Sequence, residues 1–182
     1  MTAQPATESA AAIPTAYAHL ASPLGPLLAC ARGGAIAGLW FEQGPHAPAP
    51  GPGWRRAPEE PVLRQLAREL AEYFAGKRRV FDVDVAPAGT PFQQAVWRAL
   101  RTVPYGATAS YAAIAAAIDR PRAVRATGAA NGRNPVSIVI PCHRIVGADG
   151  SLTGYAGGIA RKEWLLMLES GIVAPPPREP LA

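Results

Sequence analysis

A short linker followed by a helix-start signal divides this chain near its middle. Residues 86–89 read Ala-Pro-Ala-Gly, and residues 90–93 read Thr-Pro-Phe-Gln. The second of these is a capping box with proline at the first helical position. A length of 182 residues suits one large or two small domains. We therefore expect an N-terminal domain over residues 15–89 and a C-terminal domain over residues 90–170.

The first half has the pattern of a small α/β domain with an antiparallel sheet. The pattern of residues 16–41 predicts strands, and the Arg-Gly-Gly sequence at 32–34 predicts a hairpin turn between two of them. A Pro/Gly-rich surface loop is expected over residues 44–58. A helix is expected over residues 61–75, and the alternation over residues 81–85 predicts a half-buried strand. This half shows no catalytic constellation.

The second half is expected to be mainly helical. The capping box opens one helix, Ser110 caps a short second one, and a third is expected over about residues 122–131. Two short helices joined by a tight turn in a basic segment suggest a helix-turn-helix, although an ordinary pair of packed helices has the same pattern. A strand is expected over residues 136–140, and a last helix over about residues 161–170.

The positive charge is concentrated in this second half. Residues 1–89 contain eight Lys/Arg and eight Asp/Glu, whereas residues 90–170 contain nine Lys/Arg and four Asp/Glu. An excess of that kind favours a polyanionic partner, most simply nucleic acid. The alternative is an arginine-rich composition without a functional meaning.

The remaining composition constrains location. Hydrophobic residues make up 49% of the chain, enough for a core, but the longest apolar runs are far short of the ~20 residues that span a bilayer. Residues 1–14 contain no basic n-region and no apolar h-region, so no signal peptide is expected. We expect a flexible tail at 1–14, a disordered tail at 171–182, a cytoplasmic location and no membrane partner.

The segment Ile138–Arg144 carries the most distinctive chemistry, because it reads Ile-Val-Ile-Pro-Cys-His-Arg. A thiol between a stiffening proline and two potential cations can be held as a thiolate, the nucleophilic form of cysteine. The alternative is a buried structural cysteine at the end of a strand, since free cysteine is among the most buried residue types.

Metal chemistry is not expected. The chain has two cysteines, Cys30 and Cys142, and three histidines, and these form neither a disulfide framework nor a zinc-ligand spacing. Cys30 falls on a predicted strand and is expected to be inert core. We therefore predict no metal and no cofactor.

The predicted helix before this motif has an unusual composition. It offers Ala126, Gly128 and Ala129 around one long side chain, Arg125. A helix that reads base edges in the major groove normally presents several Asn, Gln, Arg or Lys side chains. Small residues instead allow close approach of the helix backbone to another surface, which is either nucleic acid or the interior of the protein.

Six short motifs lie within residues 90–170, and the one of highest specificity is Ile-Pro-Cys-His-Arg from Ile140. The others, in chain order, are Phe-Gln-Gln-Ala-Val-Trp from Phe92, Tyr-Gly-Ala-Thr-Ala-Ser-Tyr from Tyr105, Ala-Val-Arg-Ala-Thr-Gly-Ala-Ala-Asn-Gly-Arg-Asn-Pro from Ala123, Gly-Tyr-Ala-Gly-Gly from Gly154 and Lys-Glu-Trp-Leu-Leu from Lys162. By these motifs, residues 90–170 resemble the catalytic domain of the O6-alkylguanine-DNA alkyltransferases, a family that repairs alkylated DNA. Residues 1–89 resemble the family only weakly. The resemblance implies a ribonuclease H-like N-terminal domain and a winged helix-turn-helix C-terminal domain.

The resemblance also implies a single-turnover reaction. Double-stranded DNA with an alkyl group on guanine O6 is bound through its minor groove, and the damaged nucleotide is flipped out of the stack. Cys142 then accepts the alkyl group irreversibly. In this scheme Glu169 polarises His143, which takes the thiol proton through a water, and Asn134 braces the active-site turn. A water is expected because Cys142 and His143 would point to opposite sides of an extended segment.

Further residues receive roles by the same resemblance. Arg125 would fill the vacated stack, and the small residues of its helix, Ala126, Gly128 and Ala129, would lie against the DNA. Tyr111 would rotate the target phosphate and bind the flipped base. Tyr155 would wall the pocket, the amide of Ala156 would donate to O6, and the carbonyls of Cys142 and Ile145 would accept from the guanine amine.

Three rival functions fit parts of this pattern. A damage sensor of the alkyltransferase-like type would lack the cysteine, and a transcription factor would carry more base-reading side chains on its second helix. A cysteine hydrolase would turn over many substrates and would not need the basic half. The sequence leaves open which alkyl groups are accepted and whether O4-alkylthymine is repaired. We expect a monomer.

Overall fold

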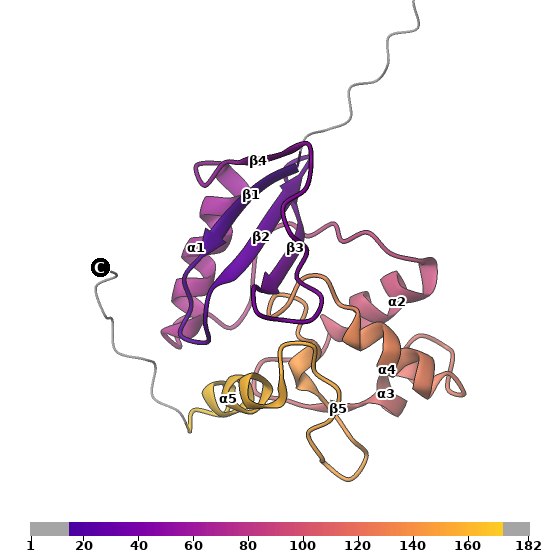
Figure 1. Ribbon diagram of the computed structural model, residues 1–182. Helices are drawn as coiled ribbons and strands as arrows, with labels where there is room; N and C mark the ends of the chain where they lie inside the picture. Colours follow the sequence, from indigo (N-terminus) through magenta and orange to yellow (C-terminus); the bar gives the residue numbers. More distant parts are fainter. Residues whose placement is uncertain (1–14, 173–182) are drawn as a thin grey trace, which may run out of the picture.

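The computed structural model describes residues 15–172, so the tail predicted at 1–14 and nearly all of that at 171–182 lie outside the described residues. The N-terminal half is a four-stranded sheet in the order β3-β2-β1-β4 with a helix packed on it (Figure 1). Its elements are β1 (Thr15–Leu20), β2 (Leu27–Arg32), β3 (Ala35–Phe41), β4 (Trp54–Arg56) and α1 (Pro61–Phe74).

The predicted hairpin and helix are both present. Gly33 and Gly34 join β2 to β3 with φ angles of 58° and 81°, a backbone conformation that suits glycine and a tight hairpin. The apolar face of α1 packs on the sheet, and its residues Leu63, Leu66 and Leu70 are at most 2% exposed. These contacts build the core of this half.

Two expectations for the N-terminal half are wrong. The loop predicted over 44–58 contains β4. This strand pairs in parallel with β1, on the side opposite β2, so the sheet is not wholly antiparallel. No strand forms over residues 81–85 beyond a single bridge from Val85 to Ile36. The carboxylate of the buried Glu69 instead accepts hydrogen bonds from the amides of Asp82 and Val83, at 2.9 and 3.2 Å, so these amides have a partner outside any ladder.

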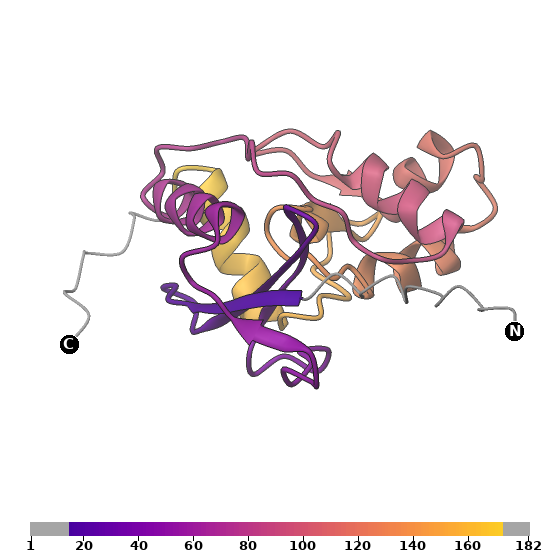
Figure 2. The same cartoon turned by 90° about the horizontal axis from the view of Figure 1, so that it is seen from above.

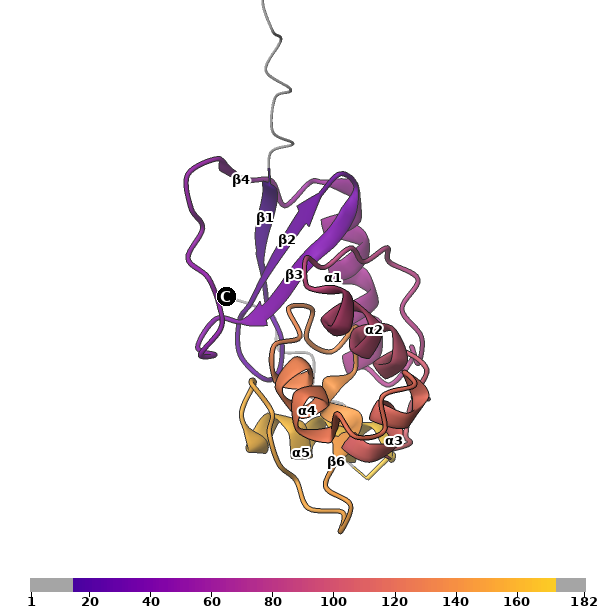
Figure 3. The same ribbon diagram turned by 90° about the vertical axis from the view of Figure 1, so that its right-hand side faces the viewer.

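The C-terminal half contains five helical segments and a small two-stranded sheet (Figure 3). Its α2 starts at the predicted capping box, in which Thr90 and Gln93 each bind the backbone amide of the other. Ser110 caps α3 as expected, and Asp119, with φ 57°, makes the turn toward α4. The elements are α2 (Pro91–Leu100), β5 (Ala109–Ser110), α3 (Tyr111–Ala117), α4 (Val124–Gly132), the 3₁₀ helix η1 (Cys142–Arg144), β6 (Ile145–Val146) and α5 (Ile159–Glu169).

The strand predicted over residues 136–140 is wrong. The segment folds as successive turns, and Ile138 has φ 70°, which is rare for a β-branched residue. It is attached to β3, because the amide of Leu39 donates to Pro135 and the carbonyl of Leu39 accepts from Ser137, at 2.8 and 2.9 Å. The long-range bonds to β3 thus replace a regular ladder.

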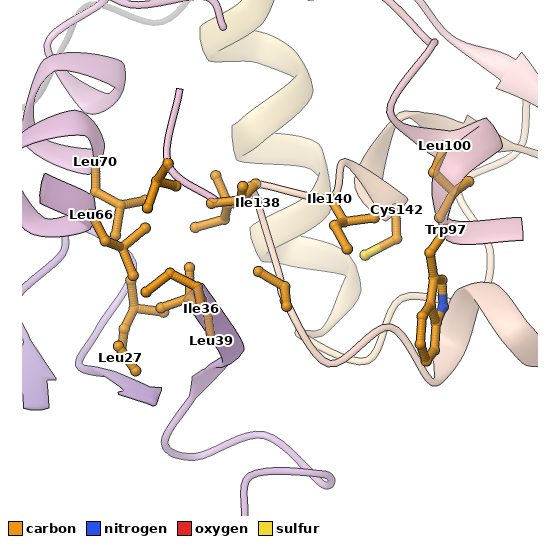
Figure 4. Close-up of a cluster of buried hydrophobic side chains, with 14 of the residues drawn as sticks. Leu27, Ile36, Leu39, Leu66, Leu70, Trp97, Leu100, Ile138, Ile140 and Cys142 are labelled. Carbon is orange, nitrogen blue, oxygen red and sulfur yellow. The ribbon is translucent and has the colours of Figure 1, made fainter. Parts of the chain in front are cut away.

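This turn segment lies between the two halves. Viewed from above, the sheet and α1 lie to one side, and α2, α3 and α4 lie to the other (Figure 2). Buried side chains run from Leu66 of α1 through Ile138 and Ile140 to Cys142 and Trp97 (Figure 4). The two halves therefore share one continuous apolar cluster that contains the cysteine. None of the helices within residues 15–172 is long and apolar enough to cross a membrane.

Candidate active site

Cys142 is the first residue of η1 and is buried, with 3% of its surface exposed. Burial raises the pKa of the thiol to about 11, and the hydrogen bond from Asn134 and the charge of Lys162 offset this only in part. The free protein therefore holds a protonated thiol at neutral pH. The expectation that neighbouring cations hold Cys142 as a resting thiolate is wrong, because desolvation dominates.

Asn134 ties the turn to the cysteine. Its Nδ2 lies 3.0 Å from the Cys142 Sγ and donates to the carbonyl of Ile140 at 2.8 Å. Its Oδ1 accepts from the amide of Val136 at 3.0 Å. One buried amide thus contacts both ends of the irregular segment and the sulfur.

Glu169 binds the side chains of both residues that follow the cysteine. His143 Nε2 lies 2.9 Å from Oε1 of Glu169, and Arg144 binds the same carboxylate through Nε at 2.9 Å and Nη2 at 3.0 Å. All three side chains are buried. Both candidate cations beside Cys142 are therefore directed at Glu169 rather than at the thiol.

The carboxylate is ionised. Burial opposes ionisation, but the hydrogen bonds and charges of His143 and Arg144 outweigh it and lower the pKa of Glu169 to about 2. A carboxylate can only accept hydrogen bonds, so the proton of a neutral His143 must lie on Nε2. Burial, opposed by Glu169, lowers the pKa of His143, so the ring is neutral at pH 7.

The other ring nitrogen is ready to accept a proton. Nδ1 of His143 is buried and has no hydrogen-bond partner among the described residues. Cys142 and His143 are neighbours in a 3₁₀ turn and not in an extended segment, so the geometric premise for their opposite directions is wrong. No direct hydrogen bond joins the thiol to the ring within the described residues.

The residues expected to form the pocket make contacts with His143, with Thr153 and with Lys162. Tyr155 is 8% exposed and its ring lies edge-on to that of His143, with centroids 6.5 Å apart. The Tyr111 hydroxyl donates to the carbonyl of Thr153 at 3.0 Å. The carbonyl of Ile145 already accepts from the buried Lys162, at 2.5 Å, but a carbonyl has a second lone pair. Ala156 is half-buried and borders a separate cavity of about 10 Å³, whose lining includes Phe41 and Asn134 but not Cys142 or Tyr155.

The helix α4 exposes its small residues. Arg125, Ala126 and Ala129 are exposed, and Gly128 lies against the ring of Tyr111, since a Cβ there would be 3.7 Å from that ring. The face is therefore open to a partner on one side and adjoins Tyr111 on the other. Its inner residues, Thr127 and Ala130, are buried.

The basic residues of this half divide into two groups. Arg144 and Lys162 are buried, and Arg161 is half-buried, donates to the carbonyl of Leu24 and lies over the ring of Phe41. These three stabilise the fold. The charge free to meet a polyanion comes from the exposed residues Arg98, Arg101, Arg120, Arg122, Arg125 and Arg133.

Three residues of the site were not predicted from the sequence. Lys162 joins the carbonyls of Ile145 and Thr153, and Asn131 donates to the carbonyl of Cys142 at 3.4 Å. Tyr73, from the N-terminal half, donates to Glu169 at 2.8 Å. A buried lysine has no local sequence signal, and a contact across 96 residues has none either. Residues 15–172 contain no cluster of His, Cys, Asp and Glu that could hold a metal ion.

Comparison with known proteins gives matches along most of the chain. The ribonuclease-like domain of 6-O-methylguanine DNA methyltransferase matches residues 15–87, and the DNA-binding domain of the same enzyme matches residues 91–171. The methylated-DNA–protein-cysteine methyltransferase of Methanosarcina barkeri is 46% identical over 84% of this chain and 96% of its own length. That of Haemophilus influenzae is 44% identical over 84% and 85%.

A solved structure extends the likeness to three dimensions. The Mycobacterium tuberculosis OGT, crystallised in complex with DNA, matches with a TM-score of 0.80 and 43% identity, over 86% of this chain and 94% of that one. The match includes both halves of the fold and their mutual arrangement.

Proposed function

This chain belongs to the 6-O-methylguanine DNA methyltransferase family. We propose that Cys142 accepts the alkyl group in a repair reaction that each molecule performs once. The family activity is direct reversal of DNA damage, in which an alkyl group moves from the DNA to a cysteine of the protein. Of the two cysteines in the chain, Cys142 is the one with a proton acceptor beside it.

The reaction is a single displacement. The sulfur of Cys142 attacks the alkyl carbon, the bond from that carbon to guanine O6 breaks, and O6 leaves with its electron pair. The thiol proton passes through a water to Nδ1 of His143, and Glu169 stabilises the resulting imidazolium through Nε2. The guanine anion takes a proton from water. The product thioether is not released by thiol exchange, so the protein does not turn over.

The free Nδ1 of His143 carries this proposal. A thiol whose pKa is about 11 is almost fully protonated at pH 7, and a base is therefore needed during the attack. Glu169 fixes the tautomer that leaves Nδ1 unprotonated. The Asn134 amide then stabilises the sulfur as its charge develops.

The DNA would lie along α4. We propose that it binds through its minor groove, with Ala126, Gly128 and Ala129 near the backbone and Arg125 in the space left by the flipped nucleotide. The exposure of these residues and the contact of Tyr111 with Gly128 support this arrangement. To bind the base, Tyr111 would exchange its bond to Thr153. A monomer and a cytoplasmic location remain part of the proposal.

The pocket must widen to receive a base. Tyr155 and the amide of Ala156 are proposed to contact the flipped guanine, with the carbonyls of Cys142 and Ile145 as acceptors for its amine. Because Cys142 is 3% exposed and Tyr155 is 8% exposed, we propose that the segment from β6 to α5, which projects from the lower end of the molecule (Figure 1), moves as the base enters.

The amount of DNA repaired per protein molecule tests the function. A duplex with one O6-methylguanine is added in tenfold excess, and restored guanine is counted by digestion and chromatography. We expect a plateau at one repaired base per molecule. Binding without repair would indicate a damage sensor, and continued turnover on DNA or esters would indicate a hydrolase.

A further inference from the structure

The N-terminal half contributes one side chain to the polar centre around Glu169. Tyr73 lies in the last turn of α1, is fully buried, and donates from its hydroxyl to Oε1 of Glu169 at 2.8 Å. The same oxygen binds Nε2 of His143 at 2.9 Å. A residue of the ribonuclease-like half is therefore one hydrogen bond from the residue that orients the proton acceptor.

The carboxylate is saturated with donors. Oε1 accepts from Tyr73, His143 and Arg144, and Oε2 accepts from Arg144 and from the amide of Gly106 at 3.1 Å. Tyr105 and Lys162 are the other titratable groups nearby, and neither donates to it, since Tyr105 bonds the carbonyl of Leu168 and Lys162 bonds two other carbonyls. Each donor takes a share of the negative charge that holds the proton on Nε2.

Tyr73 is a permanent donor in this position. Burial and the nearby carboxylate raise the pKa of Tyr73 well above its ordinary value, so the phenol stays neutral. A hydrogen bond from a neutral hydroxyl to a carboxylate is strong and lowers the basicity of the acceptor. A weaker pull on Nε2–H makes the ring less basic at Nδ1.

We propose that Tyr73 is a positioning residue for alkyl transfer, through which the N-terminal domain fixes Glu169 and limits the basicity of His143. The inference rests on the proposed role of Cys142 and His143. Through Tyr73, the N-terminal domain would influence the reaction although it contributes no reacting group.

The competing account is that Tyr73 only packs. Its ring contacts Phe74, Phe81 and Tyr105, with centroids 5.4, 5.4 and 6.0 Å away, and these contacts do not need the hydroxyl. The two accounts differ in the pH dependence of the transfer rate, because packing alone has no influence on His143.

Single-turnover rates of Tyr73→Phe across pH 5–9 test the proposal. Transfer requires neutral His143, so the rate falls on the acid side as this ring is protonated. Without the hydroxyl, Glu169 holds the imidazolium more strongly, and the acid limb should move to higher pH by about half a unit. Tyr105→Phe is the matched control, because it removes a part-buried hydroxyl that donates to the carbonyl of Leu168 and not to Glu169. The acid limb of this variant should stay at the wild-type pH.

The amplitude of each time course tests the proposed function, and the pH dependence of the rate tests the role of Tyr73. A plateau of one alkyl group per molecule with an unshifted acid limb in Tyr73→Phe would overturn the inference and leave the function intact. Loss of the plateau in the wild type would overturn the function itself. Equal rate losses at every pH in both tyrosine variants would mean packing alone, and would also overturn the inference.

A second variant covers a failure of Tyr73→Phe to fold. Insertion of 3-fluorotyrosine at position 73 keeps the hydroxyl and makes it a stronger donor. The acid limb should then move to lower pH, opposite to the shift expected for phenylalanine. An unshifted limb with 3-fluorotyrosine would contradict the inference independently.

Discussion

Cys30 and Cys142 share their burial and differ in what surrounds them. Each thiol is 3% exposed, and burial raises the pKa of each to about 11. Cys30 lies within β2, between β1 and β3, where its strand neighbours are Tyr17 and Gly38. Cys142 begins a 3₁₀ turn, receives the Asn134 amide on its sulfur and precedes a histidine with a free Nδ1.

The difference shows where the reactivity of Cys142 comes from. A low resting pKa does not distinguish it from Cys30, because desolvation dominates at both sites. The distinction lies in groups that act as the sulfur becomes charged: a donor to stabilise it and a base to take its proton. An inert resting thiol that is activated only during attack is also protected from oxidation, which proceeds through the thiolate.

Removal of the base should produce the largest change. His143→Ala leaves Cys142 buried without a proton acceptor, so it should make Cys142 as unreactive as Cys30. We expect the single-turnover transfer rate to fall about 10²- to 10⁴-fold, the usual range for general-base catalysis. Quenched-flow repair assays measure this, with DNA affinity as the control. A wild-type rate in His143→Ala would mean that a neighbouring base is not what distinguishes Cys142 from Cys30.

Removal of the charge on Glu169 should cause the next largest effect, a loss of stability. Glu169→Gln leaves Arg144 buried without its counter-ion, which costs about 3–5 kcal/mol of unfolding free energy. Urea denaturation at pH 7 measures the loss, and Glu42→Gln, on the surface pair with His19, is the matched control with an expected effect below about 1 kcal/mol. Equal losses in the two variants would contradict the assigned role of the buried cluster.

The same cluster predicts how wild-type stability depends on pH. The pKa of Glu169 is about 2 in the folded protein against 4.5 ordinarily, and that of His143 lies below its ordinary 6.5. Both groups therefore bind protons more readily when unfolded, so stability falls as pH drops, first below 6.5 and then between 4.5 and about 2. Glu169→Gln should remove the lower step. Stability that rises on acidification would contradict the cluster.

Loss of the amide donor should have an intermediate effect. Asn134→Ala removes the hydrogen bond to the sulfur, and bonds to charged groups are worth about 1.5–3 kcal/mol, so the rate should fall about 10- to 100-fold. It also frees the turn at Val136 and Ile140. Asn131→Ala, which removes a longer bond to the Cys142 carbonyl, should lose less, and the reverse order would refute the role of Asn134.

The smallest change is expected at Cys30. Cys30→Ala should lower the unfolding free energy by about 1 kcal/mol and leave the amount and rate of alkyl transfer unchanged. Thermal unfolding and the repair assay measure the two effects. Loss of transfer in this variant would remove the distinction between the two thiols.

Local sequence signals predicted the starts of the helices correctly. The capping box at Thr90, the cap at Ser110 and the glycines at 33 and 34 act through bonds to near neighbours, and each is confirmed. The family resemblance and the mixed α/β fold are confirmed as well. The chemistry was predicted from the family resemblance of residues 90–170, whose motifs, that around Cys142 included, are short runs of consecutive residues.

Long-range contacts account for the errors. The apolar run at 136–140 fits a strand by composition, but its backbone bonds to Leu39 in β3 decide its shape. Asp82 and Val83 lack a ladder because Glu69 occupies their amides. The resting state of Cys142 also depends on burial, which nearby charges in the sequence do not reveal.

The mass of the intact protein after reaction shows directly whether Cys142 is the residue that accepts the alkyl group. Wild type, Cys30→Ala and Cys142→Ala are each incubated with a duplex containing O6-methylguanine, and the protein is weighed by mass spectrometry. We expect a gain of one methylene, about 14 Da, on wild type and Cys30→Ala, once per molecule, and none on Cys142→Ala. A gain that persists in Cys142→Ala, or that disappears in Cys30→Ala, would contradict this expectation.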